Sequence, residues 1–187
     1  MKRQLIALVT SSLVSMATAA ALEKTELKIG FIALTDCAPI VIAKEKGFFE
    51  KYGLDVSVVK EGGGWAGIQQ KVISGEYDYS HALAGMPIAS TLGINGNKPM
   101  QALLSLDFNG NAITFSNNVI KQMEDNGLDP VARPVTADAL KKLVDKKRAK
   151  EGDSYKPFEF GMVYPVSTHN YEIRYWMSAA GIDPDSD

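Results

Sequence analysis

Residues 27–34 read LKIGFIAL, and this stretch decides the class of fold. A short apolar run of this kind is typical of a strand that is buried on both faces of a parallel sheet. Thr35 and Asp36 follow it and are suited to cap a helix, and Pro39 is suited to a first helical turn. We therefore predict a strand at 27–34 and then one helix that ends at Gly53, a residue suited to the position after a helix.

The alternation of strand and helix continues to about residue 108. Further strands are predicted at 54–59, 77–83 and 100–108, with short helices at 66–74 and 86–92. Such an alternation requires an α/β fold with a mainly parallel sheet and helical crossovers. Ligands of these sheets bind beyond the carboxyl ends of the strands, where the sequence places Thr35, Asp36 and the loop 61–65 (EGGGW).

A second α/β unit begins after residue 112. Helices are predicted at 119–126, 136–152 and 169–180, with strand-like segments at 113–116 and 158–164. Thr168 is expected to cap the last helix, and the Lys and Arg residues that end the middle one are expected to be solvated. So few strands do not close a domain, so we expect a first lobe at 22–112 and a truncated second lobe at 113–187.

Residues 1–21 have the pattern of an export signal. Lys2 and Arg3 precede an apolar run from Leu5 to Met16, and small residues at 17–21 offer a cleavage site. The run is too short to span a bilayer as a mature helix, and a short buried N-terminal helix is the alternative. We expect a cleavable signal peptide, a periplasmic mature chain, and no membrane insertion after cleavage.

Composition excludes several classes of function. The chain has 20 Lys and Arg against 22 Asp and Glu, and without Lys2 and Arg3 its net charge is −4. This balance gives no basic surface for nucleic acid or anionic lipid. The single Cys37 cannot form an internal disulfide and is expected to be buried. No phosphate-binding loop, nucleophile elbow or zinc-ligand spacing is present, so we predict no enzyme, no cofactor and no metal site.

Three residues are candidates for binding a ligand. Trp65 follows three glycines, which permit close backbone approach, so its ring could cover a flat ligand or pack on the core instead. His169 opens a helix whose free N–H groups and dipole favour an anion, although it could simply cover the helix end. Asn111 offers two amide donors between the two lobes, or serves only as a turn residue.

Four further residues are secondary candidates for the same cleft, and two of them, Thr35 and Asp36, lie at a strand end. His81 lies within a predicted strand, where a satisfied buried histidine is the alternative to a binding role. The secondary candidates are Thr35, Asp36, Lys71 and His81.

Four segments resemble the substrate-binding proteins of nitrate and bicarbonate ABC uptake systems. They are GFIALTDCAPIVIAKEKGFFEKYGLDV (30–56), WAGIQQKVISGEYDYSHALAGMPIASTLGI (65–94), NGNAITFSN (109–117) and STHNYEIRYWMSAAGIDPD (167–185). The resemblance implies a type II periplasmic-binding-protein-like fold with one oxyanion between two lobes. It places Trp65 at the family's cleft tryptophan and Asn111 at or beside its amide ligand. His169 matches a position where nitrate binders have His and bicarbonate binders tend to have Thr.

The resemblance also implies an ABC permease and its ATPase as partners. Nitrate only accepts hydrogen bonds and suits a site made of donors, whereas bicarbonate carries an O–H and suits a site that also offers an acceptor. His169 therefore favours nitrate or nitrite, with bicarbonate as the alternative ligand and an extracytoplasmic oxyanion sensor as the alternative role. Family members are longer than this chain, so further ligand residues are expected beyond Asp187.

Overall fold

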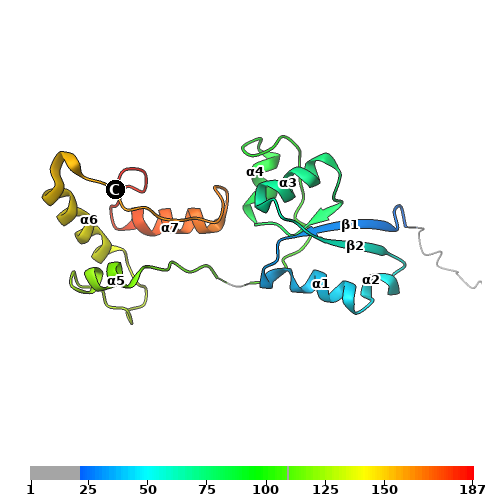
Figure 1. The fold of residues 1–187 in the computed structure, drawn as a ribbon, viewed down its shortest axis with the longest axis horizontal. Coiled ribbons are helices and arrows are strands. Elements are labelled where there is room, and N and C mark those ends of the chain that lie inside the picture. Colours follow the sequence, from blue (N-terminus) through cyan, green and yellow to red (C-terminus); the bar gives the residue numbers. More distant parts are fainter. Residues whose placement is uncertain (1–21, 109) are drawn as a thin grey trace, which may run out of the picture.

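The computed structural model describes residues 22–108 and 110–187, so the signal peptide expected at 1–21 lies outside the described residues. The chain forms an α/β unit and a helical unit, connected through residues 100–116 (Figure 1). The strands are β1 (Glu26–Phe31), β2 (Asp55–Lys60) and β3 (Tyr79–Ser80). The helices of the first unit are η1 (Thr35–Cys37), α1 (Ala38–Glu45), α2 (Phe48–Lys51), α3 (Gly64–Ser74) and α4 (Gly85–Thr91). Those of the second are α5 (Asn117–Glu124), α6 (Asp138–Glu151), η2 (Gly152–Ser154) and α7 (Thr168–Ala179).

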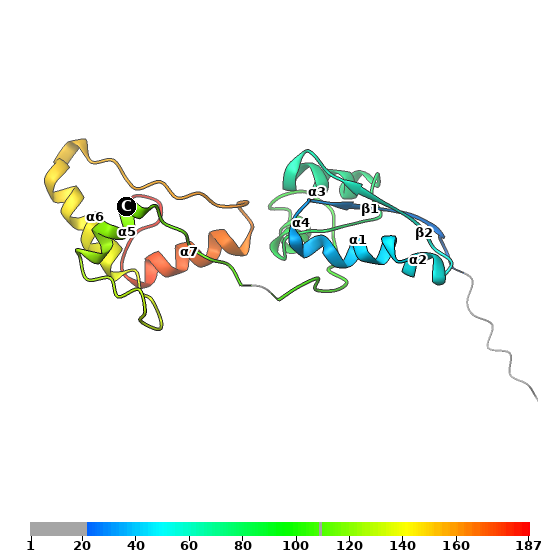
Figure 2. The ribbon, with the colours of Figure 1, turned by 60° about the horizontal axis from the view of Figure 1, so that its bottom comes forward.

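The sheet is parallel, as the sequence predicts, with the order β2-β1-β3. Leu27 lies opposite Val56, and Ile29 lies opposite Tyr79. The N–H of His81 donates to the carbonyl of Gly30, which extends the pairing just beyond β3. Figures 1 and 2 show α1 and α2 along one side of the sheet and α3 and α4 on the other. The apolar first strand is therefore central and covered on both faces.

The core of the α/β unit includes a residue from the second half of the chain. Val166 is buried in one cluster with Ile68, Tyr77, Met86 and Ala89. Asn95 Nδ2 also donates to the hydroxyl of Tyr164 over 2.6 Å. The segment just before α7 is therefore anchored on α3 and α4, and α7 starts beside the first unit (Figure 2).

Several boundaries differ from the prediction. The first strand ends at Phe31 and not at residue 34. The single helix expected after β1 is divided into η1, α1 and α2, and Gly47 separates α1 from α2 because its φ of 68° interrupts the helical path. The loop expected at 61–65 is shorter, because α3 begins at Gly64. Trp65 therefore belongs to the first turn of a helix.

Several strand predictions are wrong. Within the described residues no strand forms at 100–108, 113–116 or 158–164, and the strand expected at 77–83 is limited to β3. A strand needs a hydrogen-bonded neighbour, and the sheet order ends at β3. Leu103 and Leu104 accordingly remain 64% and 71% exposed. Segments 111–116 and 158–163 line one cavity instead of pairing, with the rings of Phe115 and Phe160 in edge contact at 5.9 Å.

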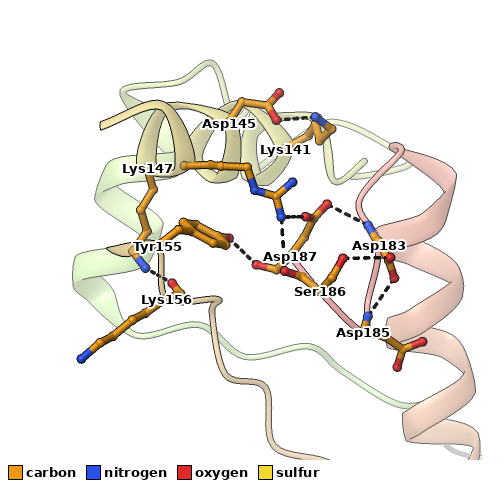
Figure 3. Close-up of polar contacts among 10 residues, drawn as sticks. Lys141, Asp145, Lys147, Tyr155, Lys156, Asp183, Asp185, Ser186 and Asp187 are labelled. Carbon is orange, nitrogen blue, oxygen red and sulfur yellow. Dashed lines mark hydrogen bonds and ion pairs between the residues drawn. The ribbon is translucent and has the colours of Figure 1, made fainter. Parts of the chain in front are cut away.

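The helical unit has its own core, and the C-terminal residues up to Asp187 are hydrogen-bonded to this unit. Buried residues from α5, α6 and α7 form one cluster, which includes Met123, Leu140, Val144, Ile173 and Met177. Figure 3 shows Tyr155, whose hydroxyl donates to the Asp187 carbonyl over 2.6 Å, and Asp183, whose N–H donates to the Asp187 carboxylate over 2.9 Å. Basic residues of α6 pair with acidic neighbours, as Lys141 does with Asp145.

None of the helices in the described part of the chain combines the length and apolar character that crossing a bilayer requires. Cys37 is buried, as the sequence predicts.

Candidate functional site

Three of the candidate residues meet at the carboxyl end of the sheet. Asp36 lies in η1 after β1, Trp65 in the first turn of α3 after β2, and His81 directly after β3. His81 Nε2 lies 3.0 Å from Asp36 Oδ2, and the rings of His81 and Trp65 meet edge to face with centroids 5.2 Å apart. The parallel order of the strands brings these residues together, because their carboxyl ends share one edge. Thr35 lies exposed beside them in η1.

This group holds unsatisfied polar atoms. His81 is 2% exposed, and its Nδ1 has no hydrogen-bond partner in the described chain. Asp36 Oδ1 is also buried without a partner there. Buried polar atoms normally have partners, so this pair is an unusual feature of the first unit. The contacts fix the His81 ring, and that ring in turn supports one edge of Trp65.

Lys71 is engaged within the first unit. Its Nζ lies 2.9 Å from Glu61 Oε2 and 3.3 Å from the Tyr77 hydroxyl. Glu61 also accepts from the Gly63 N–H over 2.7 Å and from Tyr77 over 2.9 Å. The Gly63 N–H, the Lys71 ammonium and the Tyr77 hydroxyl together lower the pKa of Glu61 to about 2. Hydrogen bonds to Glu61 first, and then to the Tyr77 hydroxyl, raise the pKa of Lys71. The roles of Glu61 and Tyr77 were not predicted from the sequence, because they depend on tertiary contacts.

The Glu61 cluster makes the stability of the chain depend on pH. A carboxylate whose pKa is lowered by folding stabilises the fold above its ordinary pKa of 4.5, and this contribution is lost as the pH falls towards about 2. We expect Glu61→Gln to lower the thermal midpoint at neutral pH and to flatten its decline between these two pH values. The measurement is thermal unfolding across that range, with exposed Glu45→Gln as the matched control. An equal pH slope in Glu61→Gln and the unmodified chain would contradict this role.

Asn111 and His169 meet in the second unit, at the start of α7. Both line a cavity of about 800 Å³ between segments 111–116 and 158–163 and helix α7. His169 is half-buried, and its Nδ1 is buried without a hydrogen-bond partner among the described residues. Two of the residues that the sequence singled out therefore share one cavity, although they are far apart in the chain. Trp65 is not among the residues that line it.

The first turn of α7, which contains the cavity-lining His169, has free backbone donors within the described chain. The capping residue is Ser167, one position before the predicted Thr168, because the Ser167 hydroxyl accepts from the Asn170 N–H over 3.3 Å. The backbone N–H groups of Thr168 and His169 have no acceptor among the described residues. Free N–H groups at a helix start, together with the helix dipole, favour an anion.

Asn111 is held by two residues of α7. Its Nδ2 donates to Thr168 Oγ1 over 2.9 Å and to Glu172 Oε2 over 2.8 Å. The sequence analysis missed Glu172. One signal could have found it, since a residue three positions after His169 lies on the same face of a helix.

The two groups adjoin a common core cluster. Trp65 packs against the cluster that contains Val166, and Val166 immediately precedes the Ser167 cap of α7. The two groups of candidate residues are thus linked through the packing of segment 164–167 on the first unit. Within the described residues, no cluster of three or more His, Cys, Asp or Glu side chains could hold a metal ion.

Comparison with known proteins identifies the family. Residues 20–187 match the NMT1-like family. The chain belongs to this family. The predicted resemblance is confirmed by named relatives, because the nitrate/nitrite binding protein NrtA of Nostoc sp. is 37% identical over 179 residues, which make up 93% of this chain and 37% of that protein. The bicarbonate-binding protein CmpA of Synechococcus elongatus is 36% identical over 178 residues, or 91% of this chain and 37% of that protein.

A solved structure confirms the fold. The crystal structure of the periplasmic nitrate-binding protein NrtA from Synechocystis matches with a TM-score of 0.65 and 36% identity, over 87% of this chain and 40% of that one. A further relative, the nitrate import ATP-binding protein NrtC of Synechocystis sp., is 40% identical over 89% of this chain and 23% of its own length. The chain therefore spans less than half the length of each of these relatives. Its fold matches part of that solved periplasmic nitrate-binding protein.

Proposed function

We propose that this chain is the N-terminal portion of the solute-binding component of an ABC uptake system. In this proposal the chain is exported by a cleavable signal peptide and captures nitrate or nitrite in the periplasm. It then delivers the anion to a permease driven by an ATPase. No covalent chemistry is involved, because closure of two lobes around a ligand is the working step of such proteins. The proposal also assigns residues 22–112 to the first lobe and residues 113–187 to a truncated second lobe.

One observation carries the proposal. Asn111 and His169 line the same cavity, and the backbone N–H groups of Thr168 and His169 at the start of α7 have no acceptor among the described residues. His169 and these backbone groups supply hydrogen-bond donors suited to a small oxyanion, and NrtA relatives are named for nitrate and nitrite. Bicarbonate is the second candidate, because Glu172 adds an acceptor to the same cavity.

The test is titration calorimetry of the mature chain. We expect saturable heat with nitrate and with nitrite, and none with chloride at equal ionic strength. The anions share a single charge but differ in their number of acceptor oxygens, so the contrast separates a built site from simple charge attraction. Titrations without saturation for nitrate, nitrite and bicarbonate alike would overturn the proposed function.

Trp65 is expected to contribute one wall of the closed site. Its ring is half-buried against His81, and in the closed protein it would cover one face of the flat anion and exclude water. We expect Trp65→Ala to weaken nitrate binding about tenfold, which corresponds to about 1.4 kcal/mol. Trp65→Phe is the control, because it keeps an aromatic face. Equal losses of nitrate affinity in Trp65→Ala and Trp65→Phe would show that the aromatic face does not contribute to binding.

A further inference from the structure

The amide of Asn111 is fully engaged on its donor side. An asparagine side chain carries two N–H hydrogens and one acceptor oxygen. Its Nδ2 donates to Thr168 Oγ1 over 2.9 Å and to Glu172 Oε2 over 2.8 Å, which uses both hydrogens. The group that Asn111 has left for a ligand is therefore its Oδ1 carbonyl, an acceptor. This differs from the role of pure donor that suits nitrate.

The charged residues that line the cavity also favour a ligand that can donate a hydrogen bond. Its lining includes two carboxylates, Glu159 and Glu172, and no Lys or Arg. Arg174 of α7 is engaged elsewhere, because its Nη2 pairs with Asp185 over 2.7 Å. The described lining therefore combines His169 with acceptors from Asn111 and Glu172, and the free N–H groups at the start of α7 lie next to His169 in the chain.

We propose that Glu172 is a specificity-determining residue of the oxyanion site. By holding the Asn111 amide, its carboxylate makes the site an acceptor as well as a donor. This acceptor improves the binding of an oxyanion that carries a hydroxyl, such as bicarbonate, relative to one that only accepts, such as nitrate, and so narrows the preference for nitrate that His169 gives the site. This inference rests on the proposed function, since it concerns the choice of ligand at that same site.

The mechanism follows from what each anion can offer. Bicarbonate can donate its O–H to the Glu172 carboxylate or to Asn111 Oδ1, while its other oxygens accept from the α7 N–H groups. Nitrate has no hydrogen to donate, so the Glu172 carboxylate only repels it. Both Asn111 amide hydrogens are already bonded to Thr168 and Glu172 and are not available to it. Hydrogen bonds to charged groups contribute enough to decide such a preference.

The test compares Glu172→Gln with Glu159→Gln by titration calorimetry at about pH 8, where bicarbonate predominates. Both variants remove one negative charge from the same cavity, but only Glu172 is bonded to Asn111. Both residues are exposed, so both variants are expected to fold, as thermal melting checks. The probes are sodium nitrate and sodium bicarbonate, titrated into the mature chain.

In Glu172→Gln we expect tighter nitrate binding and weaker bicarbonate binding, with the ratio of the two dissociation constants shifted at least about tenfold. In Glu159→Gln both anions should change in the same direction, with little change in that ratio. An unchanged ratio in Glu172→Gln, or an equal shift in Glu159→Gln, overturns the inference and leaves the proposed function standing. If the unmodified chain binds neither anion, the proposed function fails and the inference fails with it.

Discussion

Replacing His169 by alanine is expected to weaken nitrate binding ten- to a hundredfold. His169 stands in the first turn of α7 and lines the cavity that also contains Asn111. Its Nδ1 is buried and has no partner in the described chain, so the ring has a hydrogen bond left to make. Hydrogen bonds that involve a charged partner contribute about 1.5–3 kcal/mol, which is the origin of the expected range.

The measurement is titration calorimetry with nitrate, and two variants control it. His169→Asn keeps a side-chain donor close to the position of Nδ1 and should retain part of the affinity. Tyr171→Ala removes a large side chain from the same helix turn, but Tyr171 is 53% exposed and does not line the cavity, so affinity should stay unchanged. If His169→Ala bound nitrate with unchanged affinity, His169 would not be part of the binding site.

The sequence predicts this fold best where the residues of an element, together with nearby elements, supply the contacts that stabilise it. The apolar run at β1 and the β-branched residues of β2 form strands as predicted, because they pair with each other. Helices α5, α6 and α7 also form close to the predicted residues, because their apolar faces pack in one local cluster. The segment 100–108 has strand-like composition but forms no strand, because within the described residues no neighbouring strand supplies hydrogen bonds.

The candidate site shows the same division. Chain position is enough to bring Trp65 and Asp36 to one edge of a parallel sheet. The contact of His81 with both of them depends on where β3 ends, and pattern alone placed His81 inside a longer strand. The bond from Asn111 to Glu172 joins residues 61 positions apart. Such a bond follows from the packing of the 111–116 segment against α7, which no local pattern encodes.

Replacing Gly85 by alanine is expected to disturb both units at once. A Cβ at Gly85, in the first turn of α4, would overlap the backbone carbonyl of Val166. A backbone carbonyl cannot relieve the overlap by changing rotamer, as a flexible side chain can. Either α4 or the segment before α7 must therefore move. Overpacking of this kind costs about 1–3 kcal/mol of unfolding free energy, which exceeds the roughly 1 kcal/mol that alanine adds to a helix over glycine.

The functional consequence follows from the position of Val166. It directly precedes Ser167, the cap of α7, so a shift of Val166 displaces the helix start and the His169 ring. We therefore expect Gly85→Ala to lower the midpoint of chemical denaturation and to weaken nitrate binding. Gly62→Ala is the control, because a Cβ there meets no atom within 4 Å. If Gly85→Ala lost stability but kept full nitrate affinity, the start of α7 would not depend on its anchor on α4, and the link between the two groups of site residues would be disproved.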